Sequence, residues 1–195
     1  RLLKPGLQEY SYELGFVRRN FGTDSNNYGR PLAVGTHRLG ITKHFTGELH
    51  GELLGHQQTV GLGGVLMLPA TGVLSGSLAA SHSDKGVGGL LGLGFRRQSR
   101  SFSFGVTTQL ASQRFVKLGM QPEELAPRQI SQAFVNLATT DYGAFSARYT
   151  QQAFRDREDN AIVSGSYSRE VGSLGNLRMS VMRFLSGDAD TVLSL

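Results

Sequence analysis

The sequence contains no cysteine and no tryptophan, and only 18% of its 195 residues are charged. The absence of cysteine excludes disulfides and thiolate-bound metals, but it does not indicate a compartment, because oxidising compartments permit disulfides without requiring them. No apolar run reaches about 18 residues, which excludes a transmembrane helix. The basic residues are scattered although the formal charge is +5, and this scatter argues against a nucleic-acid groove.

In several segments of the sequence, apolar residues alternate with small or polar residues at every position. Between residues 74 and 81, apolar or small residues such as Leu74 and Leu78 alternate with Ser75, Ser77 and Ser81, and residues 91–96 and 102–109 behave alike. Because successive side chains of a strand point to opposite faces, the pattern predicts a sheet with one apolar face and one face of Ser, Gly, Thr, Gln and Arg. The low charge is unusual for a freely soluble surface.

The same alternation predicts about twelve strands over residues 10–195. The first predicted strands cover residues 10–16, 32–42, 48–53 and 57–68. Connections after odd-numbered strands are longer or more polar, as in residues 20–31, 112–128 and 155–160, and those after even-numbered strands are tight. Short periplasmic turns opposite longer external loops are typical of bacterial outer-membrane barrels, and aromatic residues near both strand ends would form their interfacial girdles.

The predicted fold class is therefore all-β, an antiparallel up-and-down transmembrane β-barrel in the bacterial outer membrane. In a bilayer every backbone amide must be paired, so only a closed barrel lets a sheet span it. The chain begins at Arg1 rather than Met, the first strand starts from a linker, and the last stops at Leu195 without a finishing aromatic. We therefore expect an internal piece of a longer chain that forms an arc of a larger barrel, because an isolated arc would leave two unpaired edges.

Two segments carry a resemblance to a known family. Residues 2–31 (LLKPGLQEYSYELGFVRRNFGTDSNNYGRP), residues 115–128 (FVKLGMQPEELAPR) and the repeated Leu-Gly and Phe-Gly strands resemble the outer-membrane ushers of the chaperone–usher pilus pathway, in the barrel segment after the plug domain. The resemblance implies a barrel of about two dozen strands. It makes residues 1–9 a linker from the plug region, through Lys4, Pro5 and Gly6, and residues 10–195 a partial barrel, truncated at its C-terminal end.

For function, the resemblance implies a pore that assembles chaperone-delivered pilus subunits and secretes the fibre to the cell surface. It implies no enzyme activity and no cofactor. The expected partners are periplasmic chaperone–pilin subunit complexes, reached through the full-length protein, together with its own plug domain and outer-membrane lipid. A passive outer-membrane porin-type channel is the alternative, because it shares every feature of this segment and differs only in the flanking domains. An outer-membrane barrel hydrolase and a soluble β-sandwich binding module are further alternatives.

The predicted register assigns residues to the two faces. The predicted pore-lining positions are Glu13, Glu48, His50, Glu52, Gln109, Gln132 and Arg148. They would meet the plug in the closed state and passing subunits in the open state. The alternative is that they are ordinary polar residues of the lumen without individual roles. Lipid-facing positions are Leu14, Phe16, Leu49, Leu53, Leu74, Leu78, Leu91, Leu93, Phe102 and Phe104. His37 is predicted on the apolar face of its strand.

Other chemistries find weaker support in the residues. Glu48, His50 and Glu52 share one face at a spacing of two, but an acid/base or metal site needs further ligands and a shaped pocket. The glycine runs lie inside alternating strands rather than before a helix, which argues against a phosphate loop. The acidic residues 156–159 need no cation if they form a hydrated external loop. No Ser/His/Asp set converges as a hydrolase requires.

Overall fold

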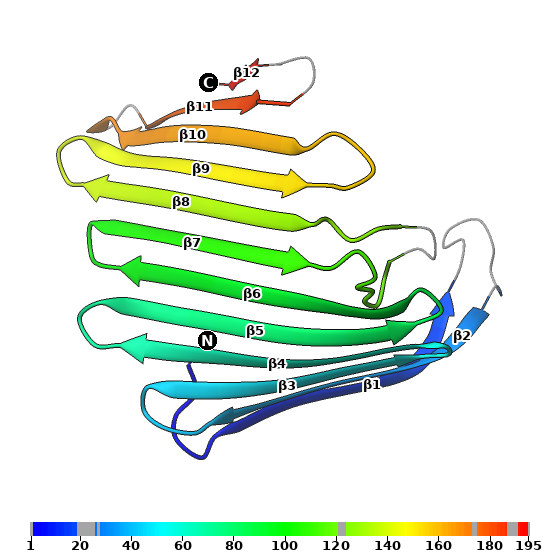
Figure 1. Ribbon diagram of the computed structural model, residues 1–195. Coiled ribbons are helices and arrows are strands. Elements are labelled where there is room, and N and C mark those ends of the chain that lie inside the picture. The colour runs from blue at the N-terminus through cyan, green and yellow to red at the C-terminus, as the bar shows by residue number, and fades with distance from the viewer. Residues whose placement is uncertain are drawn as a thin grey trace. The chain divides into compact units, whose positions relative to one another are not determined.

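A computed structural model describes residues 2–18, 26, 28–120, 124–172, 175–186 and 191–194. These residues form one 12-stranded sheet in which every strand pairs with its neighbours in sequence (Figure 1). The strands are β1 (Gln8–Arg18), β2 (Tyr28–Gly40), β3 (Phe45–Leu54), β4 (Gln57–Leu68), β5 (Gly72–Ser83), β6 (Gly86–Gln98), β7 (Phe102–Ala111), β8 (Gln129–Thr139), β9 (Gly143–Ala153), β10 (Asn160–Glu170), β11 (Asn176–Phe184) and β12 (Thr191–Ser194). No helix of the described residues is long and apolar enough to cross a membrane.

The structure confirms the predicted fold class, an all-β antiparallel up-and-down sheet, and it changes several strand bounds. β4 covers the predicted residues 57–68, but β2 begins at Tyr28, inside the predicted loop over residues 20–31. The sequence places a loop end at Pro31, yet this residue lies in the strand opposite Phe16, next to a register shift between Phe16 and Arg18. Proline is tolerated at such irregularities, because a bulge leaves backbone donors of the ladder unpaired anyway.

The chain divides into two compact units that share strands. The first unit comprises Arg1–Met67, Ser75–Leu91 and Ala111–Ala126, and the second comprises Leu68–Leu74, Gly92–Leu110 and Pro127–Leu195.

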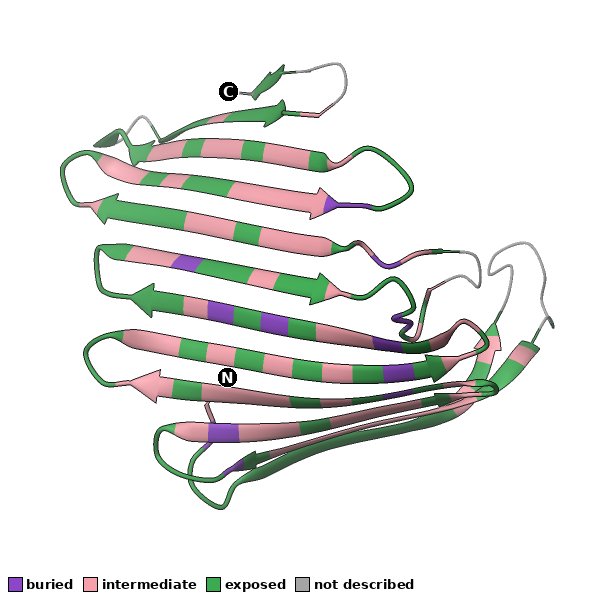
Figure 2. Cartoon of the chain, in the orientation of Figure 1, coloured by how far each residue is buried: buried purple, intermediate pink, exposed green. Residues whose placement is uncertain are grey.

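In the first unit, the cross-strand register separates two kinds of face. Glu9 lies opposite Arg38 and Arg38 opposite Glu48, and this side is called the polar face. His37 lies opposite Leu49 and Leu49 opposite Leu62, and this side is called the apolar face. Large side chains of the apolar face are uncovered, because Leu14 is 86% and Leu78 60% exposed. Figure 2 shows exposed residues, in green, along β1 and at alternating positions of β5. A soluble β-sandwich would pack such residues against a second sheet, so the described residues do not form one.

The second unit repeats the separation over β7 to β11. One row of directly opposed residues on its apolar face is Phe102, Leu137, Phe145, Tyr167 and Met179. The next row along the strands, on the polar face, is Ser103, Asn136, Ser146, Ser166 and Ser180. The ring centroids of Phe145 and Tyr167 lie 4.6 Å apart, a distance at which cross-strand aromatic pairs stabilise a sheet.

Buried apolar residues are few and lie mainly where the chain folds back onto the sheet. They include Leu3 before β1, and Phe115, Val116 and Ala126 between β7 and β8. We call residues 112–120 and 124–126 the strap, because this segment lies along the polar face of the first unit.

Candidate functional site

The polar face of β1 to β3 is organised around Arg38. Its Nη1 lies 2.8 Å from Glu9 Oε2, and its Nε lies 3.0 Å from Glu48 Oε2. The two glutamate side chains are 47% and 41% exposed, so each pair contributes only about 0–1 kcal/mol to stability. The arrangement fixes the three side chains in one cross-strand row, and the guanidinium group neutralises part of the negative charge of the polar face.

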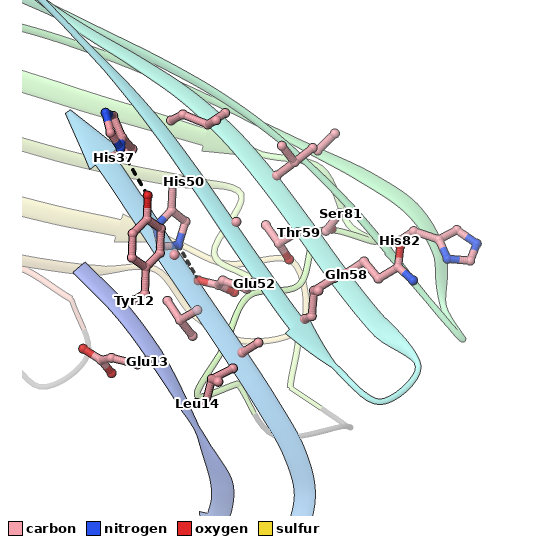
Figure 3. A pocket seen from close by; sticks show the side chains of 18 of the residues that line it. Tyr12, Glu13, Leu14, His37, His50, Glu52, Gln58, Thr59, Ser81 and His82 are labelled. Atoms are coloured by element: carbon pink, nitrogen blue, oxygen red, sulfur yellow. Dashed lines mark hydrogen bonds and ion pairs between the residues drawn. The ribbon is translucent and has the colours of Figure 1, made fainter. Parts of the chain in front are cut away.

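A second set on the same face links His50 to the strap. Thr36 Oγ1 lies 2.8 Å from His50 Nδ1. His50 Nε2 lies 3.0 Å from Glu52 Oε1, a contact marked by a dashed line in Figure 3. The other carboxylate oxygen, Glu52 Oε2, accepts a hydrogen bond from Leu118 N at 2.6 Å. Glu48 is engaged with Arg38 instead, so the predicted trio does not converge on one point. Within the part of the chain that the structure describes, no three His, Asp or Glu side chains are grouped as a metal site requires.

The strap is bound to side chains of three successive strands. Val116 N donates to Ser81 Oγ of β5 at 2.9 Å, and Thr59 Oγ1 of β4 donates to Val116 O at 3.0 Å. Together with the bond to Glu52 of β3, these contacts bury Phe115 and Val116, which are only 4% and 6% exposed. The strap therefore covers the polar face where β3 and β5 end and β4 begins.

Strand β6 approaches the strap so closely that only glycine fits. A Cβ at Gly88 would overlap the backbone N and Cα of Phe115. The next residue, Gly89, exchanges two bonds with Ser112, both of 2.8 Å: its N donates to Ser112 Oγ and its O accepts from Ser112 N. Lys85 Nζ donates to Glu124 O at 2.9 Å. The sequence predicts a plain loop over residues 112–128, and the apolar pair Phe115-Val116 inside it is the signal that a docked segment would leave.

On the polar face of the second unit, an aromatic ring lies between arginines. Phe134 lies opposite both Gly105 and Arg148 in the register. A Cβ at Gly105 would lie 2.6 Å from Phe134 Cε1, so the glycine makes room for the ring to lie across β7. The guanidinium carbon of Arg96 is 5.6 Å from the ring centroid, within the range of a cation–π contact.

The structure places the predicted pore-lining residues on the polar face and the predicted lipid-facing residues on the apolar face. Register pairs such as Glu52 with Thr59, and Gln132 with Thr107, determine the facing for β1 to β4 and β7 to β9. Alternation from Ser81 and Gly88 extends it to β5 and β6. That these faces meet water and lipid stays a prediction. Sequence reasoning missed Arg38, Arg96, Phe134 and the strap contacts, whose roles depend on register or on distant strands.

His37 lies on the apolar face, as its position in the alternation predicts. Tyr12 Oη is 3.2 Å from His37 Nδ1, and the rings of Tyr10 and His37 are stacked with centroids 6.3 Å apart. The pair lies beside a hollow of about 750 Å³ in the first unit, which is lined by residues from both faces. Figure 3 shows the pair together with Leu14 and Thr59, which also line the hollow. Tyr12 gives the imidazole a polar partner on an otherwise apolar surface, and the Tyr10 ring packs against it.

The residues before β1 also lie against the polar face. Leu3 N donates to Thr46 Oγ1 at 2.8 Å, and Gly6 N donates to Gly40 O at 2.8 Å. Thr46 is 1% exposed beneath this segment. Lys4, Pro5 and Gly6 therefore follow the polar side of β2 and β3, and their role as a plug linker stays a prediction.

Comparison with known proteins finds no matching family model and no matching curated sequence. Among solved structures, the translocation pore of the P pilus usher (PapC) matches with a TM-score of 0.79 and 16% identity, over 98% of this chain and 42% of that one. The PapC-PapD-PapK-PapG tip assembly intermediate of E. coli matches at 0.82 and 16%, over 99% and 26%. This chain has the fold of an outer-membrane β-barrel wall.

Another barrel matches less closely. OccK11 (OpdR) of Pseudomonas aeruginosa has a TM-score of 0.57 and 15% identity, over 84% of this chain and 55% of that one. At such identities the likeness establishes the fold alone. The chain spans less than half the length of the two usher chains named above, because it covers 42% and 26% of them.

Proposed function

We propose that this chain is part of the wall of an outer-membrane usher pore, which assembles chaperone-delivered pilus subunits and secretes the fibre to the cell surface. The observation that carries the proposal is the match to usher pores, which reaches TM-scores of 0.79 and 0.82 over 98% and 99% of this chain. The match to OccK11 has a TM-score of 0.57. The similar E. coli structure holds PapC together with PapD, PapK and PapG, which supports chaperone and subunit partners here.

The distribution of charge supports a membrane location. On the apolar face of the described strands no Asp, Glu or Lys is present, and the arginines of that face lie near strand ends: Arg18, Arg97, Arg169 and Arg183. A charged side chain at the bilayer midplane of a barrel costs about 2–4 kcal/mol and much less near the interfaces. The apolar face thus has the composition that lipid requires, while the glutamates gather on the opposite face.

The strap favours a second candidate, a passive porin-type channel. A segment that lies on the polar face narrows the passage behind that wall, and a narrower passage suits small solutes better than folded subunits. The flanking domains distinguish the two candidates, because an usher also carries a plug and periplasmic domains.

Fibre assembly by the full-length protein tests the proposal. Cells that express it with its own chaperone and subunits should display surface fibres in electron micrographs, and cells without it should not. Fibres that persist without the protein, together with rapid sugar-driven swelling of liposomes that contain it, would select the porin instead.

The facing of the strands is tested separately by single cysteines at neighbouring positions. Glu48→Cys should react with a membrane-impermeant thiol reagent in the open pore, and Leu49→Cys should not, because Glu48 lies opposite Arg38 and Leu49 opposite His37. Equal reactivity of the two variants would contradict the assignment of faces.

A further inference from the structure

The polar face of the second unit carries three arginines, each on a different strand. Arg96 on β6, Arg148 on β9 and Arg178 on β11 form no ion pair within the described residues. On the polar-face positions of β7 to β11 the sole acid is Glu170, the last residue of β10. The first unit differs, because its glutamates gather on β1 and β3: Glu9, Glu13, Glu48 and Glu52.

Hydroxyl and amide groups fill the row between these arginines. Asn136 Nδ2 donates to Ser103 Oγ at 3.1 Å, and the Oγ atoms of Ser146 and Ser166 are 2.7 Å apart. The row continues to Ser180 on β11 and borders a hollow of about 310 Å³. From β7 to β11 the row is roughly 19 Å wide, because neighbouring strands lie about 4.8 Å apart.

The arginines flank this row on both sides. Arg148 is two residues from Ser146 along β9, and Arg178 is two residues from Ser180 along β11, so each points to the same face as the row. The ring of Phe134, seated over Gly105, holds the guanidinium of Arg96 beside them through the cation–π contact. All three arginine side chains belong to exposed residues.

We propose that Arg96, Arg148, Arg178 and the serine row form a carboxylate-binding strip that contacts the acidic surface of a folded protein in transit. Guanidinium groups bind carboxylates through two parallel hydrogen bonds, and hydroxyls donate further ones. The strip is wider than a small organic acid is long, and its width is comparable with that of a contact patch on the surface of a folded protein. Separate, individually weak contacts also let a passing protein leave, as conduction through a pore requires. The inference about the cargo rests on the proposed function.

Ion selectivity of the full-length protein tests the charge of the strip without any cargo. In planar bilayers under a KCl gradient, the open-channel current of the wild type should reverse at a potential that indicates selectivity for chloride. In the variant Arg96→Glu/Arg148→Glu/Arg178→Glu, the reversal potential should move towards the equilibrium potential of potassium. The variant Arg100→Glu/Arg155→Glu/Arg157→Glu changes the charge equally in a turn and a loop, and it should shift the potential less. Replacement of the three strip arginines by lysine should preserve the wild-type value. Equal shifts in the two glutamate variants would overturn the proposal.

Added carboxylates distinguish the possible ligands. An oligoglutamate peptide should interrupt the wild-type current and have no effect on the strip variant, while succinate at the same carboxylate concentration should leave both currents unchanged. Block by succinate, or no block by the peptide, would overturn the assignment to an acidic protein surface. These readouts need no fibre assembly, so the strip and the usher function can fail independently.

Discussion

The contact between Gly88 and the strap predicts that a single methyl group detaches a whole segment. A Cβ at residue 88 would overlap backbone atoms of Phe115 and not a flexible side chain, so the strap itself must move. Gly88→Ala should therefore release residues 112–120 from the polar face while the strands beneath remain paired. The neighbouring Gly89→Ala is a matched control, because its Cβ would meet only Ala79 O, at 3.8 Å.

Burial of Phe115 and Val116 contributes about 1.5–3 kcal/mol each to the attachment of the strap. The hydrogen bonds with Ser81 and Thr59 contribute about 0.5–1.5 kcal/mol each, and the bond to the Glu52 carboxylate contributes about 1.5–3 kcal/mol. Steric overlap in a packed site typically costs about 1–3 kcal/mol, as much as one of these contacts provides. This cost should raise the population of the detached strap several-fold or more.

Limited trypsin digestion measures the release, because Arg114 and Lys117 lie within the strap. In the full-length protein in outer membranes, Gly88→Ala should be cut between residues 114 and 118 several times faster than the wild type, and Gly89→Ala should match the wild type. Equal rates in all three proteins would refute the reasoning that the strap depends on this glycine.

Three further predictions concern the strap and the two faces. Glu52→Gln keeps an acceptor for Leu118 N but removes its charge, so trypsin should cut the strap faster than in the wild type and more slowly than in Gly88→Ala. Leu78→Arg should lower the free energy of unfolding by about 2–4 kcal/mol in lipid vesicles, whereas Ser77→Arg, on the opposite face, should change it by less than about 1 kcal/mol; equal losses would contradict the facing. Gly105→Ala should destabilise the protein by about 1–3 kcal/mol in thermal or urea unfolding, because the new methyl group collides with the ring of Phe134. In a protein that also carries Phe134→Ala, the cost of Gly105→Ala should be smaller. Additive effects of the two substitutions would exclude this contact.

The strands and their faces could be predicted from the sequence because alternation is a local property. Leu49 and His50 point to opposite sides whatever the register, so a correct strand assignment is enough to place them. The bounds of a strand are harder to predict where a residue is compatible with both a strand and a loop. Pro31 is typical of loops, and its position beside a bulge in β2 depends on how β1 pairs with it.

The contacts of the strap could not be predicted because they join distant residues. The bonds of Ser81, Thr59 and Glu52 to the strap span 35, 57 and 66 residues, and each uses a backbone group that leaves no trace in the sequence. Arg38 is similar: its two glutamates lie on different neighbouring strands, so their convergence appears only once the register of β1, β2 and β3 is known.

The way the strap is attached also sets an order of folding events. Every described strand pairs with its neighbour in the chain, so each hairpin needs only local contacts, which form fast. The surface to which the strap binds is complete only when β3, β4, β5 and β6 are all aligned. The strap itself follows β7 in the chain and is therefore synthesised after these strands. Protection of Phe115 from hydroxyl-radical labelling should therefore appear last in this part of the chain, and it would report that β3 to β6 have become aligned.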